Sequence, residues 1–188
     1  MKKFYIADTH FSDNNILTYY SRPFTDVDEM DDKIIGRWNS VVGHEDTVYL
    51  LGDIGNVDKL QECNGRIVVV LGNHDRNNET ITKLEQFMYD RFLEIRDKEE
   101  KGYEGVVAIY DYPVMDTEIG AWLSHEPIDY MPPQIPYLNI HGHTHTYNYN
   151  PGSLSWKDGN RAFNVSAENI NYTPISLEDI VKAVGYGE

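Results

Sequence analysis

The sequence predicts a layered α/β fold in a single domain that spans residues 1–188. Its first part alternates short apolar runs, rich in strand-forming residues, with amphipathic segments of helical periodicity, and its later part consists mostly of strands. Several of the apolar runs end in glycine or aspartate and are followed by further polar residues. Because open α/β sheets bind ligands beyond the carboxyl ends of their strands, we expect the functional site there.

The first part of the chain is expected to contain three buried strands and two helices. The apolar runs predict strands over residues 3–7, 47–51 and 66–71. A helix is predicted over 26–42, where apolar residues recur at helical spacing. Thr25 is its expected N-cap, because acidic residues fill the turn that follows. The same spacing predicts a second helix over 79–90.

The later part is expected to be mostly strands. A hairpin turn at 99–102 is predicted to join strands near 92–97 and 105–111. Further strands are predicted over 121–124, 138–140 and 162–165, with a proline-rich loop over 127–136 after the first of them. A last helix is predicted over 176–184, and Ser176 is its expected N-cap.

The composition limits the classes of function. The chain carries 31 acidic and 16 basic side chains, a formal net charge of -15, which repels polyphosphate backbones and makes extended nucleic acid an unfavourable partner. No apolar run approaches the roughly 20 residues that a membrane-spanning helix needs. The single cysteine, Cys63, excludes an internal disulfide framework and favours a reducing compartment. We therefore expect a cytoplasmic protein with no membrane contact, and the oligomeric state stays open.

Polar clusters follow the predicted strands and contain most of the histidines. The histidines in these clusters are His10, His74, His125, His143 and His145. Imidazole, carboxylate and amide oxygen are suitable ligands for divalent metal ions. Residues two apart in an extended segment point the same way, so Asp8 with His10, and His143 with His145, can each face one region of space. Each motif is weak by itself, since Asn73-His74-Asp75 is also suited to capping a helix, but their combination indicates a metal site.

The order of the motifs, D-x-H, G-D, G-N-H-D, H and G-H-x-H, resembles the calcineurin-like metallophosphoesterase superfamily over residues 8–145. The segments HFSDNNILTYYSRPF and FNVSAENINYTPISLEDI resemble a small single-domain bacterial or phage-type branch of it. The resemblance implies a four-layer α/β/β/α sandwich, with two mixed β-sheets flanked by helices. It also implies a dinuclear metal centre between the strand ends.

Carried onto this sequence, the resemblance implies seven metal ligands. One ion would be held by Asp8, His10 and His145, the other by Asn73, His125 and His143, and Asp53 would bridge the two. The ions would be divalent Mn, Fe, Zn or Ni, with Mn expected to serve in vitro. The implied activity is hydrolysis of a small phosphomonoester or phosphodiester through attack by metal-activated hydroxide.

The resemblance gives His74 a separate role, as the general acid or electrostatic stabiliser of the leaving group. In protein-phosphatase members the second motif reads G-D-x-x-D-R, and its later aspartate orients this histidine. Asn56 and Val57 stand at those two positions here, which disfavours protein phosphatase activity. Asp75 is the candidate to orient His74 in place of the missing aspartate.

Arg22 and Arg76 are candidates for binding the substrate phosphate, because a guanidinium can bind phosphate through two parallel hydrogen bonds. Tyr130, Tyr147 and Tyr149 are candidates to wall a substrate pocket. Two other functions stay open. A nuclease-type phosphodiesterase would need a basic track beside the metals, which the net charge disfavours. A non-catalytic scaffold on the same fold would be expected to lose metal ligands, whereas every ligand position is filled here.

Overall fold

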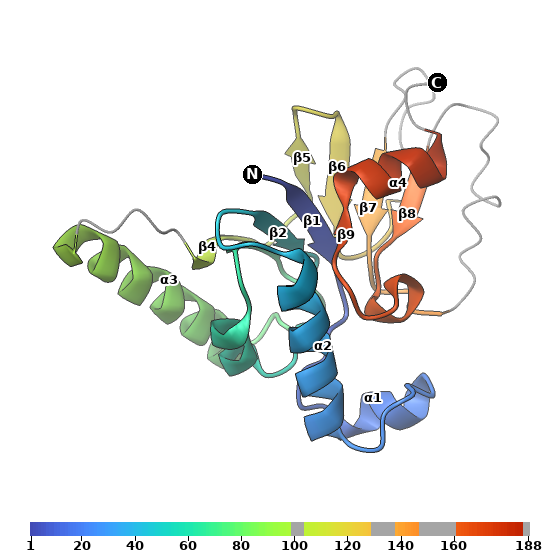
Figure 1. The fold of residues 1–188 in the computed structure, drawn as a ribbon, viewed down its shortest axis with the longest axis horizontal. Coiled ribbons are helices and arrows are strands. Elements are labelled where there is room, and N and C mark those ends of the chain that lie inside the picture. The colour runs from blue at the N-terminus through green and yellow to red at the C-terminus, as the bar shows by residue number, and fades with distance from the viewer. Residues whose placement is uncertain (99–103, 129–137, 147–160, 186–188) are drawn as a thin grey trace.

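The computed structural model describes residues 1–98, 104–128, 138–146 and 161–185, and it has two mixed β-sheets flanked by helices (Figure 1). The five-stranded sheet has the order β4–β3–β2–β1–β9 and the four-stranded sheet the order β5–β6–β7–β8. The strands of the first sheet are β1 (Lys3–Ile6), β2 (Thr47–Leu50), β3 (Arg66–Val70), β4 (Gly105–Tyr110) and β9 (Ile175–Ser176). Those of the second are β5 (Val114–Asp116), β6 (Ala121–Ser124), β7 (Leu138–His141) and β8 (Arg161–Asn164). The predicted α/β sandwich is confirmed.

Most neighbouring strands run parallel, and this decides where polar residues gather. Strands β1 to β4 are parallel to one another, as are β6, β7 and β8, while β9 and β5 are antiparallel to their neighbours. Ile6 lies opposite Leu50, so β1 and β2 end level with each other. The carboxyl ends of the parallel strands in each sheet therefore meet at one edge.

An apolar core fills the space between the two sheets. It includes Tyr5, Leu51 and Val70 from the five-stranded side, and Leu123 and Ile140 from β6 and β7. Each of these side chains is at most 2% exposed. Burying a side chain of this size stabilises the fold by about 1.5–3 kcal/mol, so this layer fixes the sheets face to face.

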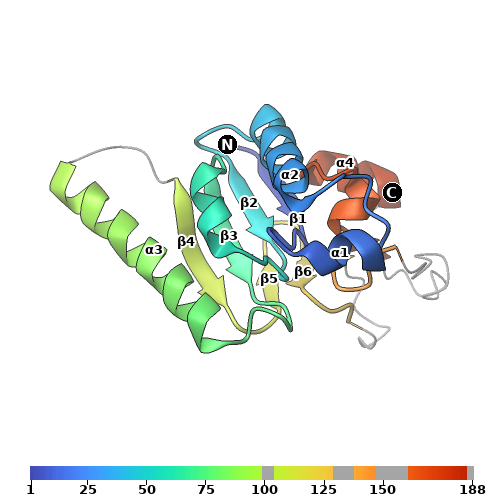
Figure 2. The ribbon, with the colours of Figure 1, turned by 90° about the horizontal axis from the view of Figure 1, so that it is seen from below.

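The helices are α1 (Asn14–Tyr19), α2 (Val27–Val41), α3 (Asn78–Lys98) and α4 (Leu177–Val184), with short 3₁₀ helices η1 (Val57–Glu62) and η3 (Ala167–Ile170). Helix α2 buries Met30, Ile34 and Trp38 in a second apolar cluster with residues of β1, β2 and β3. Figures 1 and 2 show α3 running beside β4 and extending past the sheet. Ser176 caps α4 by accepting a hydrogen bond from the Asp179 backbone, as predicted.

Two local predictions are wrong. Asp26, not Thr25, is the N-cap of α2, because the Asp26 carboxylate accepts a hydrogen bond from the Glu29 backbone and Thr25 binds the Glu29 side chain instead. The strand predicted near 92–97 belongs to α3, which continues to Lys98. The hairpin turn at 99–102 and most of the proline-rich loop lie outside the described residues.

The lone cysteine is buried behind η1. Burial raises the pKa of the Cys63 thiol to about 12, so it stays protonated near neutral pH, which disfavours a nucleophilic role. Among the residues that the structure describes, no helix combines the length and apolar character needed to cross a membrane.

Candidate metal centre

The structure brings the seven predicted metal ligands together at the carboxyl ends of parallel strands from both sheets. Asp8 and His10 follow β1, Asp53 follows β2, Asn73 follows β3, His125 follows β6, and His143 and His145 follow β7. The backbone joins these segments directly: Asp8 N donates to Gly52 O, and Gly142 N donates to His125 O. The expected clustering of polar residues at the strand ends is therefore present.

Six of these side chains form two groups in which ligand atoms lie within 4.8 Å of one another. We call Asp8, His10 and His145 the first group, and Asp53, His125 and His143 the second group. Asn73 joins the second group, because its Oδ1 lies 3.0 Å from both His125 Nε2 and His143 Nδ1. This division matches the one that the resemblance implies.

Asp53 lies between the two groups. Its Oδ2 is 3.7 Å from His10 Nε2 in the first group and 3.4 Å from His125 Nε2 in the second. Its other oxygen, Oδ1, accepts a hydrogen bond from the His74 backbone at 3.0 Å. One carboxylate oxygen therefore faces ligand nitrogens of both groups, as a bridging ligand requires.

Three histidines are oriented by partners on their outer nitrogen, Nδ1. His125 Nδ1 lies 2.8 Å from Leu51 O, His145 Nδ1 lies 3.1 Å from Glu168 Oε1, and His10 Nδ1 lies 3.7 Å from Asp13 Oδ2. A partner that accepts the Nδ1 proton leaves Nε2 as the nitrogen that can bind a metal ion, and it is Nε2 that faces a carboxylate of the centre in each case.

The first group contains buried polar atoms that lack a partner. Among the described residues, Asp8 Oδ1 and His10 Nε2 are both buried and form no hydrogen bond. An unsatisfied buried polar atom costs about 1–3 kcal/mol, and more when it is charged. A divalent cation would satisfy a carboxylate oxygen and an imidazole nitrogen at once, so the residues fit a metal ion.

The electrostatics of the centre favour positive charge. Burial raises the pKa of Asp8, and burial lowers the pKa of His10 to about 4, so this imidazole is neutral at pH 7. Burial opposes charge on His125, but its hydrogen bond to Asp53 and the charge of Asp8 outweigh burial and raise its pKa to about 9. Despite burial, contacts with His125 lower the pKa of Asp53 to about 2. The low pKa of Asp53 and the high pKa of His125 therefore indicate that this part of the centre favours a cation.

The backbone of the centre adopts conformations that most residues avoid. Five ligands have a positive φ: Asp8 at 56°, His10 at 48°, Asp53 at 53°, His143 at 69° and His145 at 47°. Gly72 permits the closest approach, because a Cβ there would overlap the Asp53 carboxylate and backbone nitrogen. Left-handed turns and a missing side chain thus let the strand-end segments converge.

His74 lies at the open side of the centre, where its side chain is 69% exposed and its Nε2 is 3.9 Å from Asp53 Oδ2. The prediction that Asp75 orients His74 is wrong. Its buried carboxylate instead accepts hydrogen bonds from the backbone nitrogens of Asp53, Ile54 and Gly72, at 2.7, 3.0 and 2.9 Å. Asp75 therefore fixes the loops that carry Asp53 and His74.

The prediction that Arg22 binds the substrate phosphate is wrong, whereas the one for Arg76 stays a prediction. Arg22 is buried and donates hydrogen bonds to the main-chain oxygens of Asp8 and Thr9 and to Glu168, so its guanidinium is not available to a substrate. Arg76 is exposed and binds Asp111 through Nε and Nη2. Its predicted role as a phosphate ligand would require that exposed ion pair to open.

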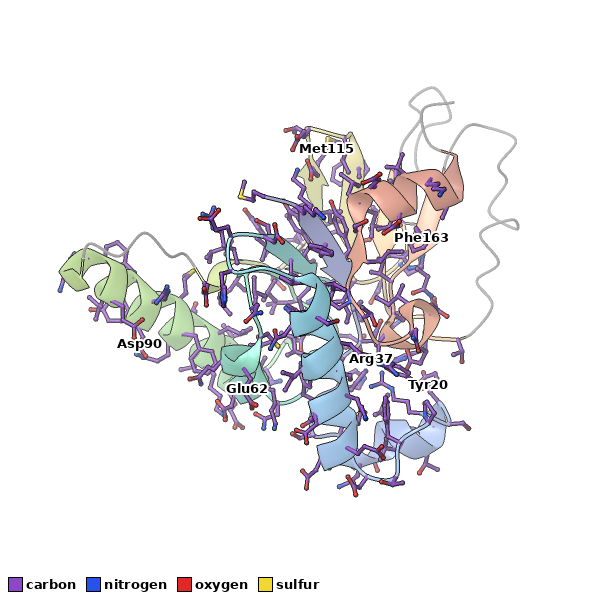
Figure 3. All side chains as sticks on the ribbon, viewed as in Figure 1. Tyr20, Arg37, Glu62, Asp90, Met115 and Phe163 are labelled. Carbon is purple, nitrogen blue, oxygen red and sulfur yellow. The ribbon has the colours of Figure 1, made fainter. Side chains whose placement is uncertain are left out.

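Two residues that contact the first group were not predicted from the sequence. Glu168 accepts from His145, and the ring of Tyr20, labelled in Figure 3, stacks on the His145 ring with 3.7 Å between centroids. Both occur in the segments that carried the resemblance to the small branch, which was the available signal. Tyr130, Tyr147 and Tyr149 lie outside the described residues.

Comparisons with known proteins place the chain among relatives. No protein-family model matches it. The gene 66 protein of Mycobacterium phage L5 is 42% identical over 59 residues, which cover 27% of this chain and 28% of that protein. The crystal structure of AQ665, a protein of unknown function from Aquifex aeolicus, has a TM-score of 0.65 and 25% identity to this chain, and covers 97% of it and 99% of its own length.

A further relative extends over the whole chain. The uncharacterized protein MJ1445 of Methanocaldococcus jannaschii is 32% identical over 197 residues, which cover 100% of this chain and 94% of that protein. Identity at this level over nearly the full length of both proteins reflects a common fold and descent. The chain belongs to the same family as MJ1445.

Proposed function

We propose that the chain is a calcineurin-like metallophosphoesterase that hydrolyses a small phosphomonoester or phosphodiester with two divalent metal ions. The observation that carries the proposal is the position of Asp53 Oδ2, 3.7 Å from His10 Nε2 and 3.4 Å from His125 Nε2, between two groups of metal-ligating side chains. A structural metal site needs one closed ligand set, whereas paired sites that share a carboxylate suit phosphoryl transfer.

The seven side chains have different roles in this proposal. Asp8, His10 and His145 would hold one ion, Asn73, His125 and His143 the other, and Asp53 both. When bound, two such ions lower the pKa of a water molecule towards ~7 and stabilise charge on the phosphoryl oxygens. The hydrogen bonds that His125 donates to Leu51 O and His145 donates to Glu168 Oε1 keep Nε2 of each ring directed at the centre, so little reorganisation is needed.

His74 is suited to protonate the leaving oxygen. Its backbone nitrogen is fixed on Asp53 Oδ1 at 3.0 Å, while its ring is exposed, reaches Asp53 Oδ2 with Nε2 at 3.9 Å and belongs to neither ligand group. The imidazole can therefore hold a proton on the side from which a small phosphate ester enters.

Replacing His74 by alanine is expected to lower kcat by roughly 100-fold, near the lower end for loss of a general acid. The content of bound metal should not change, because His74 belongs to neither ligand group. Steady-state hydrolysis and metal analysis of the same preparations check both statements. A variant with the kcat of the native protein would remove His74 from the mechanism.

The proposal itself is tested by metal content and hydrolysis. Metal-free protein, prepared with a chelator, is titrated with Mn²⁺ in a calorimeter and assayed with p-nitrophenyl phosphate and bis-p-nitrophenyl phosphate. We expect two binding events, and hydrolysis only after Mn²⁺ is restored. A folded protein that binds no Mn²⁺, Fe²⁺, Zn²⁺ or Ni²⁺ would contradict the proposal. Cleavage of single-stranded DNA or RNA in preference to both small esters would favour the nuclease.

The cytoplasmic location stays a prediction.

A further inference from the structure

A buried ion pair lies behind the first group. Arg22 Nε and Nη2 lie 2.8 and 2.7 Å from Glu168 Oε1, and the two side chains are 0% and 4% exposed. The two residues are 146 positions apart in the sequence. A buried pair of this kind gains little stability over apolar residues, because removing both charges from water offsets their attraction. The ion pair instead holds the residues of the first group in position.

Arg22 holds the loop that carries two ligands. Its Nη2 donates to Asp8 O at 2.6 Å and its Nη1 donates to Thr9 O at 2.8 Å. Asp8 and His10 both have a positive φ, so the backbone here needs outside support. The guanidinium, which presents several donors in a fixed plane, supports this conformation from the inner side of the loop.

Glu168 holds the third ligand of the same group. Its Oε1 accepts from His145 Nδ1 at 3.1 Å, and His145 Nε2 then lies 3.7 Å from Asp8 Oδ1. Stacking of Tyr20 at an interplanar angle of 17° fixes the tilt of the ring. One oxygen of Glu168 is thus shared between the arginine that supports Asp8 and the histidine that faces Asp8.

We propose that Arg22 and Glu168 are positioning residues that act as one unit to assemble the first group, and that the second group depends on them only indirectly, through the His143 backbone nitrogen, which donates to Asp8 Oδ2 at 2.9 Å. In the second group, the partner of His125 Nδ1 is a main-chain oxygen, Leu51 O. Loss of the ion pair should therefore affect the metal site of the first group far more than that of the second. The inference rests on the proposed function for its metal readout, but its structural part is independent of metal.

The metal readout uses variants of Glu168. In a Mn²⁺ titration of metal-free protein, Glu168→Ala is expected to weaken one of two binding events by about 10- to 100-fold, the range for loss of a partner behind a metal-bound histidine, and to weaken the other much less. Glu168→Gln keeps an acceptor oxygen and should recover part of the loss. Glu178→Ala, an exposed glutamate on α4, is the matched control and should behave as the native protein. Equal weakening of both events, or of neither, would overturn the inference.

The second readout needs no metal. Nitrogen-15 NMR of the histidine rings in metal-free native protein should show the proton of His145 on Nδ1, and Glu168→Gln should reduce the population of that tautomer. A native His145 protonated on Nε2 alone would overturn the inference whatever the metal content. If the Nδ1 tautomer is present but no metal binds, the positioning stands and the proposed function fails. Should Glu168→Ala not fold, Glu168→Gln and Arg22→Lys give the same comparison.

Discussion

Replacing Asp53 by asparagine is expected to abolish hydrolysis and to weaken both metal-binding events at once. Each metal ion lowers the free energy of the transition state by several kcal/mol, because it stabilises the charge that develops there. Losing both ions should therefore lower kcat/KM on the order of 10³-fold or more. The reason is the position of Oδ2, which faces ligand nitrogens of both groups. An amide keeps the shape of the side chain but removes the negative charge that two cations would share.

The measurement is a Mn²⁺ titration of the metal-free variant together with hydrolysis of the two p-nitrophenyl esters. Asp58→Asn, an exposed aspartate on η1, removes the same charge away from the centre and should leave both readouts unchanged. Retention of two binding events by Asp53→Asn would show that Asp53 does not bridge. Loss of one event alone would assign this carboxylate to a single ion.

Replacing Gly72 by alanine is expected to destabilise the protein and to prevent metal binding. The added Cβ would overlap the Asp53 carboxylate and backbone nitrogen, and neither can move far because Asp75 holds that backbone. Overpacking of this kind costs about 1–3 kcal/mol, which lowers Tm by about 2–4 °C per kcal/mol for a chain of this size. Thermal unfolding of the metal-free protein measures the first effect, and a Mn²⁺ titration measures the second.

Gly36 supplies the control for this substitution. It lies inside α2, and a Cβ there would meet no atom within 4 Å. Gly36→Ala should therefore raise stability by up to about 1 kcal/mol, as alanine does in a helix interior, and should not alter metal binding. A Gly72→Ala protein as stable and as metal-binding as the native one would show that the loops around Asp53 can open.

The strand ends and their polar residues could be predicted from the sequence because both signals are local. A buried strand shows as an apolar run, and glycine and aspartate mark its end. The partners of those residues could not be predicted in this way. Asp75 is next to His74 in the sequence, but its carboxylate binds the backbone nitrogens of Asp53 and Ile54, which lie 22 and 21 residues earlier in the chain.

Arg22 and Glu168 illustrate the same limit. An arginine near a proposed site of phosphate chemistry is a reasonable phosphate ligand by type, and only the tertiary structure shows the Arg22 guanidinium turned inward onto Asp8, Thr9 and Glu168. The length of α3 was predicted too short for a different reason. The helix continues to Lys98, but apolar residues in its last part, such as Phe92, are exposed, so the apolar pattern there does not mark a buried face.

The left-handed backbone at five of the seven proposed metal ligands sets the proposed metal binding against thermal stability. A non-glycine residue held in this conformation costs about 1–3 kcal/mol, and glycine would relieve that cost at each position. Without ions, a variant such as His143→Gly should therefore resist heat better than the native chain, while it loses a ligand. Bound metal ions would reverse this order of thermal stability, because they would stabilise the native chain, which retains His143. Selection for stability alone would therefore replace these strained residues, whereas selection for the proposed hydrolysis would retain them.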